Sequence, residues 1–283
     1  MNYCRFGFPA GGQTPTELDY MEYANDTAAR AAYVASDADI DVSSESTTVY
    51  QGNYSLGVIV IPGSSVIYVE KTIGTPINIS DCNTIRFAVW GIYSGTYFRL
   101  KLYDSGAGLI LTVPLVISKE DKGKWKEWII DISELPSASL DSINKIRIEY
   151  VGQNLTAAMY IDDLKASYDT IITITSCAPS LPIGVQPVIN QIISEAVSGV
   201  KQTAELGEKR DTFEISFPHL NSDEFNNLIA FMANTVQWKL KPFYYTYLPT
   251  NKSWNVYLDG FDRQDRKGNI YFVKLRLCER IAL

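Results

Sequence analysis

Residues 98–104, FRLKLYD, decide the fold. Phe98, Leu100 and Leu102 alternate with Arg99 and Lys101. Alternation with a period of two marks a strand that has one buried face and one wet face. The same pattern recurs in residues 85–92, IRFAVWGI, and in residues 145–150, KIRIEY. Turn residues separate these strands at intervals suited to antiparallel pairing, so the sequence predicts a mainly β protein that begins with a two-sheet β-sandwich.

Length and composition limit the possible functions. With 283 residues, 46% of them hydrophobic and 18 tyrosines, the chain can form two medium β-rich domains. Its net charge of −7, without a run of Lys or Arg, makes nucleic acid an unexpected partner. The N-terminus lacks the pattern of a secretion signal, and no stretch reaches the roughly 18 apolar residues of a membrane span. We therefore expect synthesis in the cytoplasm without a signal peptide.

The cysteines and the histidine give no sign of catalysis. Cys4, Cys82, Cys177 and Cys278 are widely spaced and are predicted to be free thiols. His219 is the only histidine, which excludes sites built on several imidazoles. The sequence also contains no glycine-rich phosphate loop and no nucleophile elbow. We expect that the protein is not an enzyme.

Four stretches of the first 170 residues carry a family resemblance. They are residues 18–34, LDYMEYANDTAARAAYV, 50–60, YQGNYSLGVIV, 123–135, GKWKEWIIDISEL, and 159–169, MYIDDLKASYD. In this order they resemble the jelly-roll carbohydrate-binding modules and related galactose-binding-like domains. The resemblance covers roughly residues 15 to 170. It implies a jelly-roll β-sandwich that binds a carbohydrate.

Two acidic residues are candidate metal ligands. The strand period in residues 160–164, YIDDL, places Asp162 on one face with Tyr160 and Leu164. A carboxylate on an apolar face needs hydrogen-bond donors or a cation, and hard oxygen ligands suit calcium. The resemblance implies a structural Ca²⁺ held by Glu22 and Asp162. The alternative is that Asp162 accepts backbone hydrogen bonds and Glu22 is only solvated.

Aromatic residues are the candidates for sugar binding, because a ring can stack on the apolar face of a sugar. Trp90, Tyr93, Tyr97 and Tyr103 lie on or between the central strands. Trp90 has the same strand parity as Arg86, which favours a solvent-exposed face. The alternative for each of the four rings is packing within the protein or at an interface.

Residues 171–187, IITITSCAPSLPIGVQP, contain three prolines and are predicted to be a linker between domain 1–170 and domain 188–283. The second domain is predicted to be a small β-barrel or sandwich with one helix at about residues 222–235. Asn221 is its expected N-cap, three residues before Glu224. Phe225, Leu228, Ile229 and Met232 recur at helical spacing and predict one apolar stripe.

The order of these elements resembles the core domain of distal tail and related baseplate proteins of tailed bacteriophages, over about residues 185 to 283. The resemblance implies a virion structural protein that forms a homo-oligomeric ring around the tail axis. It also implies partners such as the tail tube, hub and fibres, and a sandwich domain that projects outward to host surface polysaccharide. The alternative is a stand-alone carbohydrate-binding protein.

Overall fold

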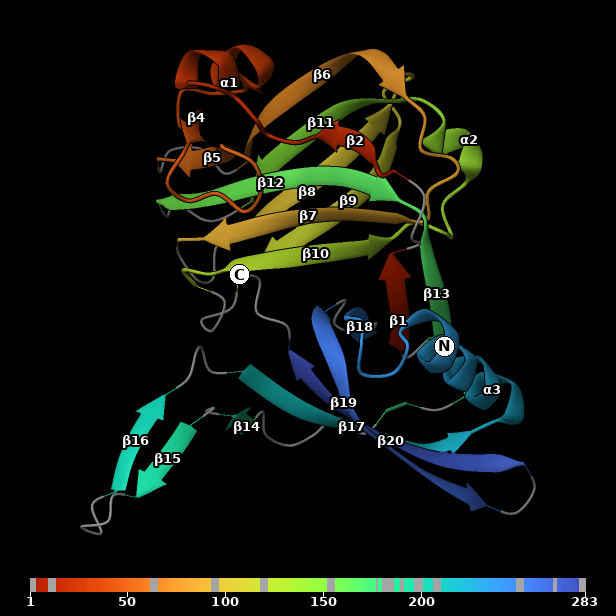
Figure 1. Ribbon diagram of the computed structural model, residues 1–283. Coiled ribbons are helices and arrows are strands. Elements are labelled where there is room, and N and C mark those ends of the chain that lie inside the picture. The colour runs from red at the N-terminus through yellow and green to blue at the C-terminus, as the bar shows by residue number, and fades with distance from the viewer. Residues whose placement is uncertain are drawn as a thin grey trace. The chain divides into compact units, whose positions relative to one another are not determined.

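The computed structural model describes residues 4–9, 14–61, 66–92, 97–117, 122–151, 156–176, 178–179, 186–188, 191–195, 201–205, 210–247, 252–266 and 269–279. The fold is mainly β, as predicted, and divides into two compact units (Figure 1). One unit is Ala10–Asp169. The other combines Met1–Pro9 with Thr170–Leu283.

The unit Ala10–Asp169 is a jelly-roll β-sandwich of two antiparallel sheets, which Figure 1 shows as two layers. One sheet has the order β10 (Trp125–Asp131), β7 (Thr84–Gly91), β12 (Ala157–Ser167), β5 (Ser55–Val60) and β4 (Ile40–Glu45), with β2 (Thr16–Asp19) also paired to β12. The other has the order β3 (Val34–Ala35), β6 (Ile67–Ile77), β11 (Ile143–Tyr150), β8 (Tyr97–Asp104) and β9 (Leu109–Val116). Two short helices, α1 (Asp26–Ala32) and α2 (Ser137–Leu140), complete it.

The apolar positions of the alternating strands form the core between these sheets. Phe98, Leu100 and Leu102 are fully buried, while the intervening Arg99 is exposed and Lys101 partly exposed. Trp128 is partly buried and stacks on the buried ring of Phe87, with centroids 6.2 Å apart. The alternation that predicted a half-buried sandwich is confirmed.

The other unit is built on a seven-stranded sheet. Its order is β13 (Asp169–Ile174), β1 (Cys4–Pro9), β18 (Phe243–Tyr247), β19 (Lys252–Arg266), β20 (Ile270–Glu279), β17 (Arg210–Leu220) and β14 (Gln186–Val188). Strands β15 (Gln191–Glu195) and β16 (Lys201–Glu205) form a separate two-stranded sheet. The unit thus contains the first and the last described residues of the chain.

The observed boundaries differ from the predicted ones. Residues 4–9 were expected in the first domain, but β1 pairs with β18 in the second unit. The side chain of Phe6 explains this, because it packs against a cluster of buried aromatic rings from distant strands and the helix: Phe217, Phe231, Phe243 and Tyr245. The start of the predicted linker is also strand, since β13 extends to Ile174. The sandwich is therefore inserted within the other unit.

The predicted helix is present. Helix α3 (Ser222–Ala230) continues into a π-helix, η1 (Phe231–Thr235), and Asn221 caps its start by accepting a hydrogen bond from Glu224 N at 2.9 Å. The apolar stripe packs into the core of this unit. The Glu224 carboxylate instead binds the chain after β13, through Thr175 N at 2.6 Å and Ser176 N at 2.9 Å. Of the helices in the described ranges, not one has the length and apolar character to cross a membrane.

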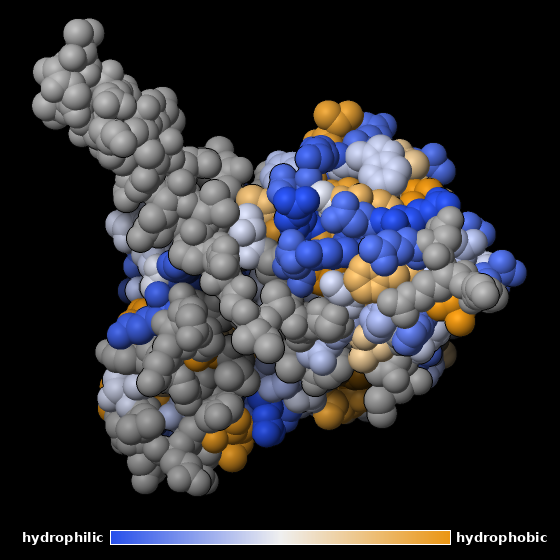
Figure 2. All heavy atoms as spheres, turned by 90° about the horizontal axis from the view of Figure 1, so that it is seen from below, coloured by the Kyte–Doolittle hydropathy of each residue, from blue (hydrophilic) through white to orange (hydrophobic). Residues whose placement is uncertain are grey.

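Exposed hydrophobic side chains are scattered. On the face drawn in Figure 2, the coloured hydrophobic residues alternate with hydrophilic ones. The most exposed large hydrophobic side chains among the described residues include Val34 in β3 and Leu240 in the segment after η1. Single exposed side chains of this kind are ordinary on a protein surface and do not by themselves mark a binding site.

Candidate functional site

The outer face of the sheet formed by β3, β6, β11, β8 and β9 carries a group of polar and aromatic side chains that contact one another. We call it the charged sheet face. The strand alternation that buries the apolar residues turns the others outward. Three adjacent strands supply its central residues: Tyr68, Glu70 and Thr72 from β6, Lys145, Arg147 and Glu149 from β11, and Arg99, Lys101 and Tyr103 from β8.

Arg147 lies at the centre of this face. Its guanidinium carbon is 3.9 Å from the centroid of the Tyr68 ring and 5.0 Å from that of Tyr103. The Arg147 Nε and Nη2 atoms also lie 2.7 and 2.6 Å from Glu70 Oε2. Cation–π contacts and charge-assisted hydrogen bonds both fix the guanidinium plane. Arg147 and the two tyrosines therefore form one preorganised aromatic and cationic row.

Each carboxylate of the charged sheet face is shared by two cations. Glu70 binds Lys145 at 2.9 Å as well as Arg147, and Glu149 lies 2.7 Å from Lys101 and 3.7 Å from Arg99. Burial raises the pKa of Glu70, but the hydrogen bonds from Lys145 and Arg147 outweigh burial and hold that pKa below its usual value. The Glu70 carboxylate is therefore charged at neutral pH.

The sequence-predicted aromatic residues do not form one site. Tyr103 lies on the charged sheet face. Tyr97 begins β8, but its side chain lies outside the described residues, as does all of Tyr93. Trp90 lies on the outer face of the other sheet, in β7. The sandwich core therefore separates Trp90 from Tyr103, and sugar binding by any of the four rings stays a prediction.

Trp90 belongs to an aromatic row of its own. It pairs with Trp125 in β10 and Tyr160 in β12, and the Trp90 and Trp125 rings meet edge to face with centroids 5.9 Å apart. Tyr50 also packs against Trp125, with ring centroids 5.6 Å apart. Each of these four rings is partly buried and most are packed against one another. Packing accounts for this row at least as well as ligand binding.

Tyr68, Glu70, Lys145, Arg147 and Glu149 were not predicted as site residues. A signal for part of the set was present, because Arg147 stands between Ile146 and Ile148 and must face away from the core. What the sequence could not reveal is that β6 and β8 flank β11 on either side. That arrangement alone brings the Tyr68 and Tyr103 rings to Arg147.

The predicted calcium ligands hold one loop. Asp162 Oδ2 accepts hydrogen bonds from Tyr50 N at 2.9 Å and Gln51 N at 3.0 Å, and both Glu22 oxygens lie 3.0 to 3.1 Å from Asn53 N. Asp162 thus accepts backbone hydrogen bonds, as expected if it holds the loop without a calcium ion. Burial, partly offset by these hydrogen bonds, raises its pKa to about 6.

A calcium ion fits this region only in part. Asp162 Oδ1 is buried and has no hydrogen-bond partner, so it is a free oxygen ligand. Both carboxylate oxygens of Glu22 already accept a hydrogen bond from Asn53 N. Within the described part of the chain there is no group of three or more His, Cys, Asp or Glu residues that could hold a metal ion. Calcium at Glu22 and Asp162 stays a prediction.

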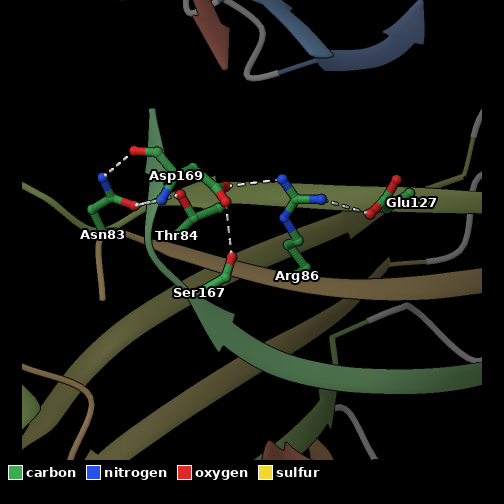
Figure 3. A network of polar contacts seen from close by, with 6 residues as sticks. All are labelled: Asn83, Thr84, Arg86, Glu127, Ser167 and Asp169. Atoms are coloured by element: carbon green, nitrogen blue, oxygen red, sulfur yellow. Dashed lines mark hydrogen bonds and ion pairs between the residues drawn. The ribbon is translucent and has the colours of Figure 1, made fainter. Parts of the chain in front are cut away.

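A polar network lies at one end of the sheet that contains β7 and β12 (Figure 3). Arg86 in β7 lies 2.9 Å from Asp169 Oδ2 and 3.5 Å from Glu127 Oε1. The Asn83 side chain donates to the backbone oxygen of Asp169 and accepts from its backbone nitrogen, each at 2.8 Å. Ser167 Oγ donates to Asp169 Oδ1 at 3.2 Å. The network fixes the chain where it leaves the sandwich.

Comparisons with known proteins return no family model and no curated protein that matches this chain. Solved structures similar to it include an exo-beta-agarase, with a TM-score of 0.44 and 13% identity. The match covers 55% of this chain and 25% of the agarase chain. A family 11 carbohydrate-binding module of a cellulosomal cellulase from Clostridium thermocellum has a TM-score of 0.40 and 14% identity, covering 56% of this chain and 96% of the module. A family 30 carbohydrate-binding module has a TM-score of 0.37 and 16% identity, covering 48% and 78%.

This chain spans about a quarter of the length of the agarase structures that it matches, 25% and 26%. Likenesses of this size by themselves assign no function to it. The evidence for function therefore lies in the residues of the chain.

Proposed function

We propose that this chain is a carbohydrate-binding protein and that a polysaccharide lies across the charged sheet face. The observation that carries the proposal is the row formed by Tyr68, Arg147 and Tyr103, with the guanidinium 3.9 and 5.0 Å from the two ring centroids. The jelly-roll fold and the sequence stretches that resemble carbohydrate-binding modules support it.

The chemistry of the charged sheet face suits a sugar. Tyrosine rings offer an apolar surface for the C–H groups of a pyranose, and their hydroxyls hydrogen-bond at its edge. Arg147, Lys101 and Lys145 offer donors to sugar hydroxyls, while Glu70 and Glu149 offer acceptors. Ion pairs and ring contacts already hold these side chains, so little conformational entropy is lost when a ligand binds. A sheet surface can also contact several units of an extended chain at once.

A glycan array with the full chain tests the proposal. We expect binding to a set of related polysaccharides, and we expect Arg147→Ala to lose it while its melting curve stays cooperative. A chain that binds none of the glycans, or an Arg147→Ala variant that binds like the parent, would contradict the proposal.

Assembly into a phage tail is a second candidate role, carried by the unit that contains α3. What favours it, besides the sequence resemblance, is that the β15–β16 hairpin forms a sheet of its own among the described residues. An isolated two-stranded hairpin is marginally stable in water, and a neighbouring copy or another tail protein would stabilise it. Electron microscopy of the purified chain should then show rings, whereas a monomer at every concentration would exclude this role.

We further propose that Asp162 holds a structural calcium ion through Oδ1. The buried, unpartnered oxygen supports this, because a buried carboxylate oxygen without a donor is costly unless a cation occupies it. Glu22 would have to release Asn53 N to join. The ion would then fix the loop that carries Tyr50 and Gln51.

A further inference from the structure

Two cations lie directly opposite each other in the middle of the charged sheet face. The register of β11 and β8 pairs Arg147 with Lys101. Like charges in directly opposite positions destabilise a sheet. Sequences tend to break such local rules where function requires it, so the Arg147–Lys101 pair indicates a place where negative charge is expected from outside the protein.

The charged sheet face also has more positive than negative groups. Among the residues of this face that the structure describes, Arg99, Lys101, Lys145 and Arg147 surround two carboxylates, and each carboxylate is shared between two of the cations. The internal ion pairs therefore leave two positive charges uncompensated within this group of six residues.

Three of the four cations reach further into solvent than either carboxylate, whereas Lys101, at 16%, is more exposed than Glu149 but not than Glu70. The side chain of Glu149 is 7% exposed, whereas that of its partner Arg99 is 44% exposed. Glu70, at 18%, is likewise less exposed than Lys145, at 24%. A ligand on the charged sheet face therefore meets Arg99, Lys145 and Arg147 before the carboxylates, although the chain as a whole carries a net charge of −7. Local charge of one sign attracts ligands of the other sign and raises their association rate.

From this charge pattern we infer that the polysaccharide is anionic, with its carboxylate or sulfate groups over the Arg147–Lys101 pair. The inference rests on the proposed function and names the class of ligand for the same site. A neutral glycan would use the tyrosine rings and the hydrogen-bonding groups but would leave the two surplus charges without a partner. An acidic glycan uses both.

Matched pairs of polysaccharides test the inference with the full chain. One pair is polygalacturonate and its methyl ester, and the other is a sulfated galactan and its desulfated form. We expect at least about tenfold tighter binding of the acidic member in one or both pairs, with most of the difference lost between about 50 and 300 mM NaCl because salt screens exposed charges. The pair that shows the difference identifies carboxylate or sulfate as the bound group.

Two substitutions that each remove one positive charge, Lys101→Gln and Lys124→Gln, distinguish binding at the charged sheet face from general electrostatic attraction. Lys101→Gln should remove most of the preference for the acidic member, and Lys101→Arg should retain it. Lys124→Gln, at an exposed position before β10 of the other sheet, should change neither affinity by more than about twofold. If Lys101→Gln does not fold, the salt dependence of the parent protein on the two matched pairs still tests the inference.

The outcomes distinguish the two claims. Equal binding of the acidic and neutral members would overturn the inference and leave the proposed function intact. Failure to bind any member of either pair would overturn both. Equally tight binding of double-stranded DNA would reveal attraction to any polyanion without sugar recognition, and it too would overturn the inference.

Discussion

Asp169 Oδ2 lies 2.9 Å from the Arg86 guanidinium, and the Asp169 side chain is completely buried. Asp169 is the last residue of the sandwich unit and the first residue of β13. The Asn83 side chain makes hydrogen bonds with both the backbone nitrogen and the backbone oxygen of Asp169. A side-chain ion pair and two backbone hydrogen bonds thus fix the point at which the chain crosses between the units (Figure 3).

Replacing Arg86 should destabilise the sandwich. Arg86→Met removes this cation from a fully buried carboxylate, and we expect the free energy of unfolding to fall by about 3 kcal/mol. Urea unfolding measures this. Glu127→Gln is the control, because its 3.5 Å contact with Arg86 is longer and more exposed, and it should cost less than about 1 kcal/mol. An equal effect of both substitutions would contradict the role given to Asp169.

Replacing Phe6 should destabilise the other unit. Its ring contacts four aromatic rings of that unit, and Phe6→Ala should cost about 3 to 4 kcal/mol through the cavity it leaves. Leu240→Ala is the control, since Leu240 is 75% exposed, and its effect should stay below about 0.5 kcal/mol. Calorimetry should show the melting transition of one unit moving while that of the sandwich stays. A shift of the sandwich transition alone would contradict the insertion.

The Glu224 carboxylate should make stability depend on pH. Burial raises its pKa, but the hydrogen bonds from Ser176 and Thr175 outweigh burial and lower it. The Glu224 carboxyl binds a proton less readily in the folded state than in the unfolded state. The stability that the Glu224 carboxylate contributes is therefore present above the usual pKa of a glutamate and is lost as pH falls through the folded pKa. Glu224→Gln should therefore cost about 1 to 2 kcal/mol at pH 7 and much less at pH 3. Urea unfolding at both pH values measures this, and an equal cost at both would contradict it.

Calcium should stabilise the sandwich if Asp162 binds it. At a calcium concentration about one hundred times the Kd, the gain is about 2.7 kcal/mol. The melting temperature should rise with calcium and fall with EDTA, and Asp162→Asn should respond to neither. A parent protein whose melting temperature is the same in calcium and in EDTA would remove the calcium proposal.

Local patterns predicted the strands but not which strands meet. The alternation in residues 98–104 showed which side chains of β8 face outward, because a period of two assigns every residue to a face. Trp90 and Tyr103 are both outward, yet consecutive strands β7 and β8 belong to different sheets. The crossing between sheets depends on packing over the whole sandwich, so the sequence did not reveal that the two rings lie on opposite faces.

The same limit applies to the chain termini. Residues 4–9, CRFGFP, form one short strand whose partner β18 lies near the other end of the chain. A single short strand does not specify a distant partner, and only the fit of Phe6 among aromatic rings does. The helix at residues 222–235 could be predicted because its cap and its apolar stripe are local features.

The most direct test of the central claim compares Tyr103→Ala with Trp90→Ala, on the polysaccharide that the full chain binds best. The two rings lie on opposite outer faces of the same sandwich, so each variant is the control for the other. We expect Tyr103→Ala to weaken binding at least about tenfold, roughly 1.4 kcal/mol, and Trp90→Ala to bind within about twofold of the parent protein even if its melting temperature falls. Loss of binding in Trp90→Ala together with full affinity in Tyr103→Ala would contradict the charged sheet face as the binding site.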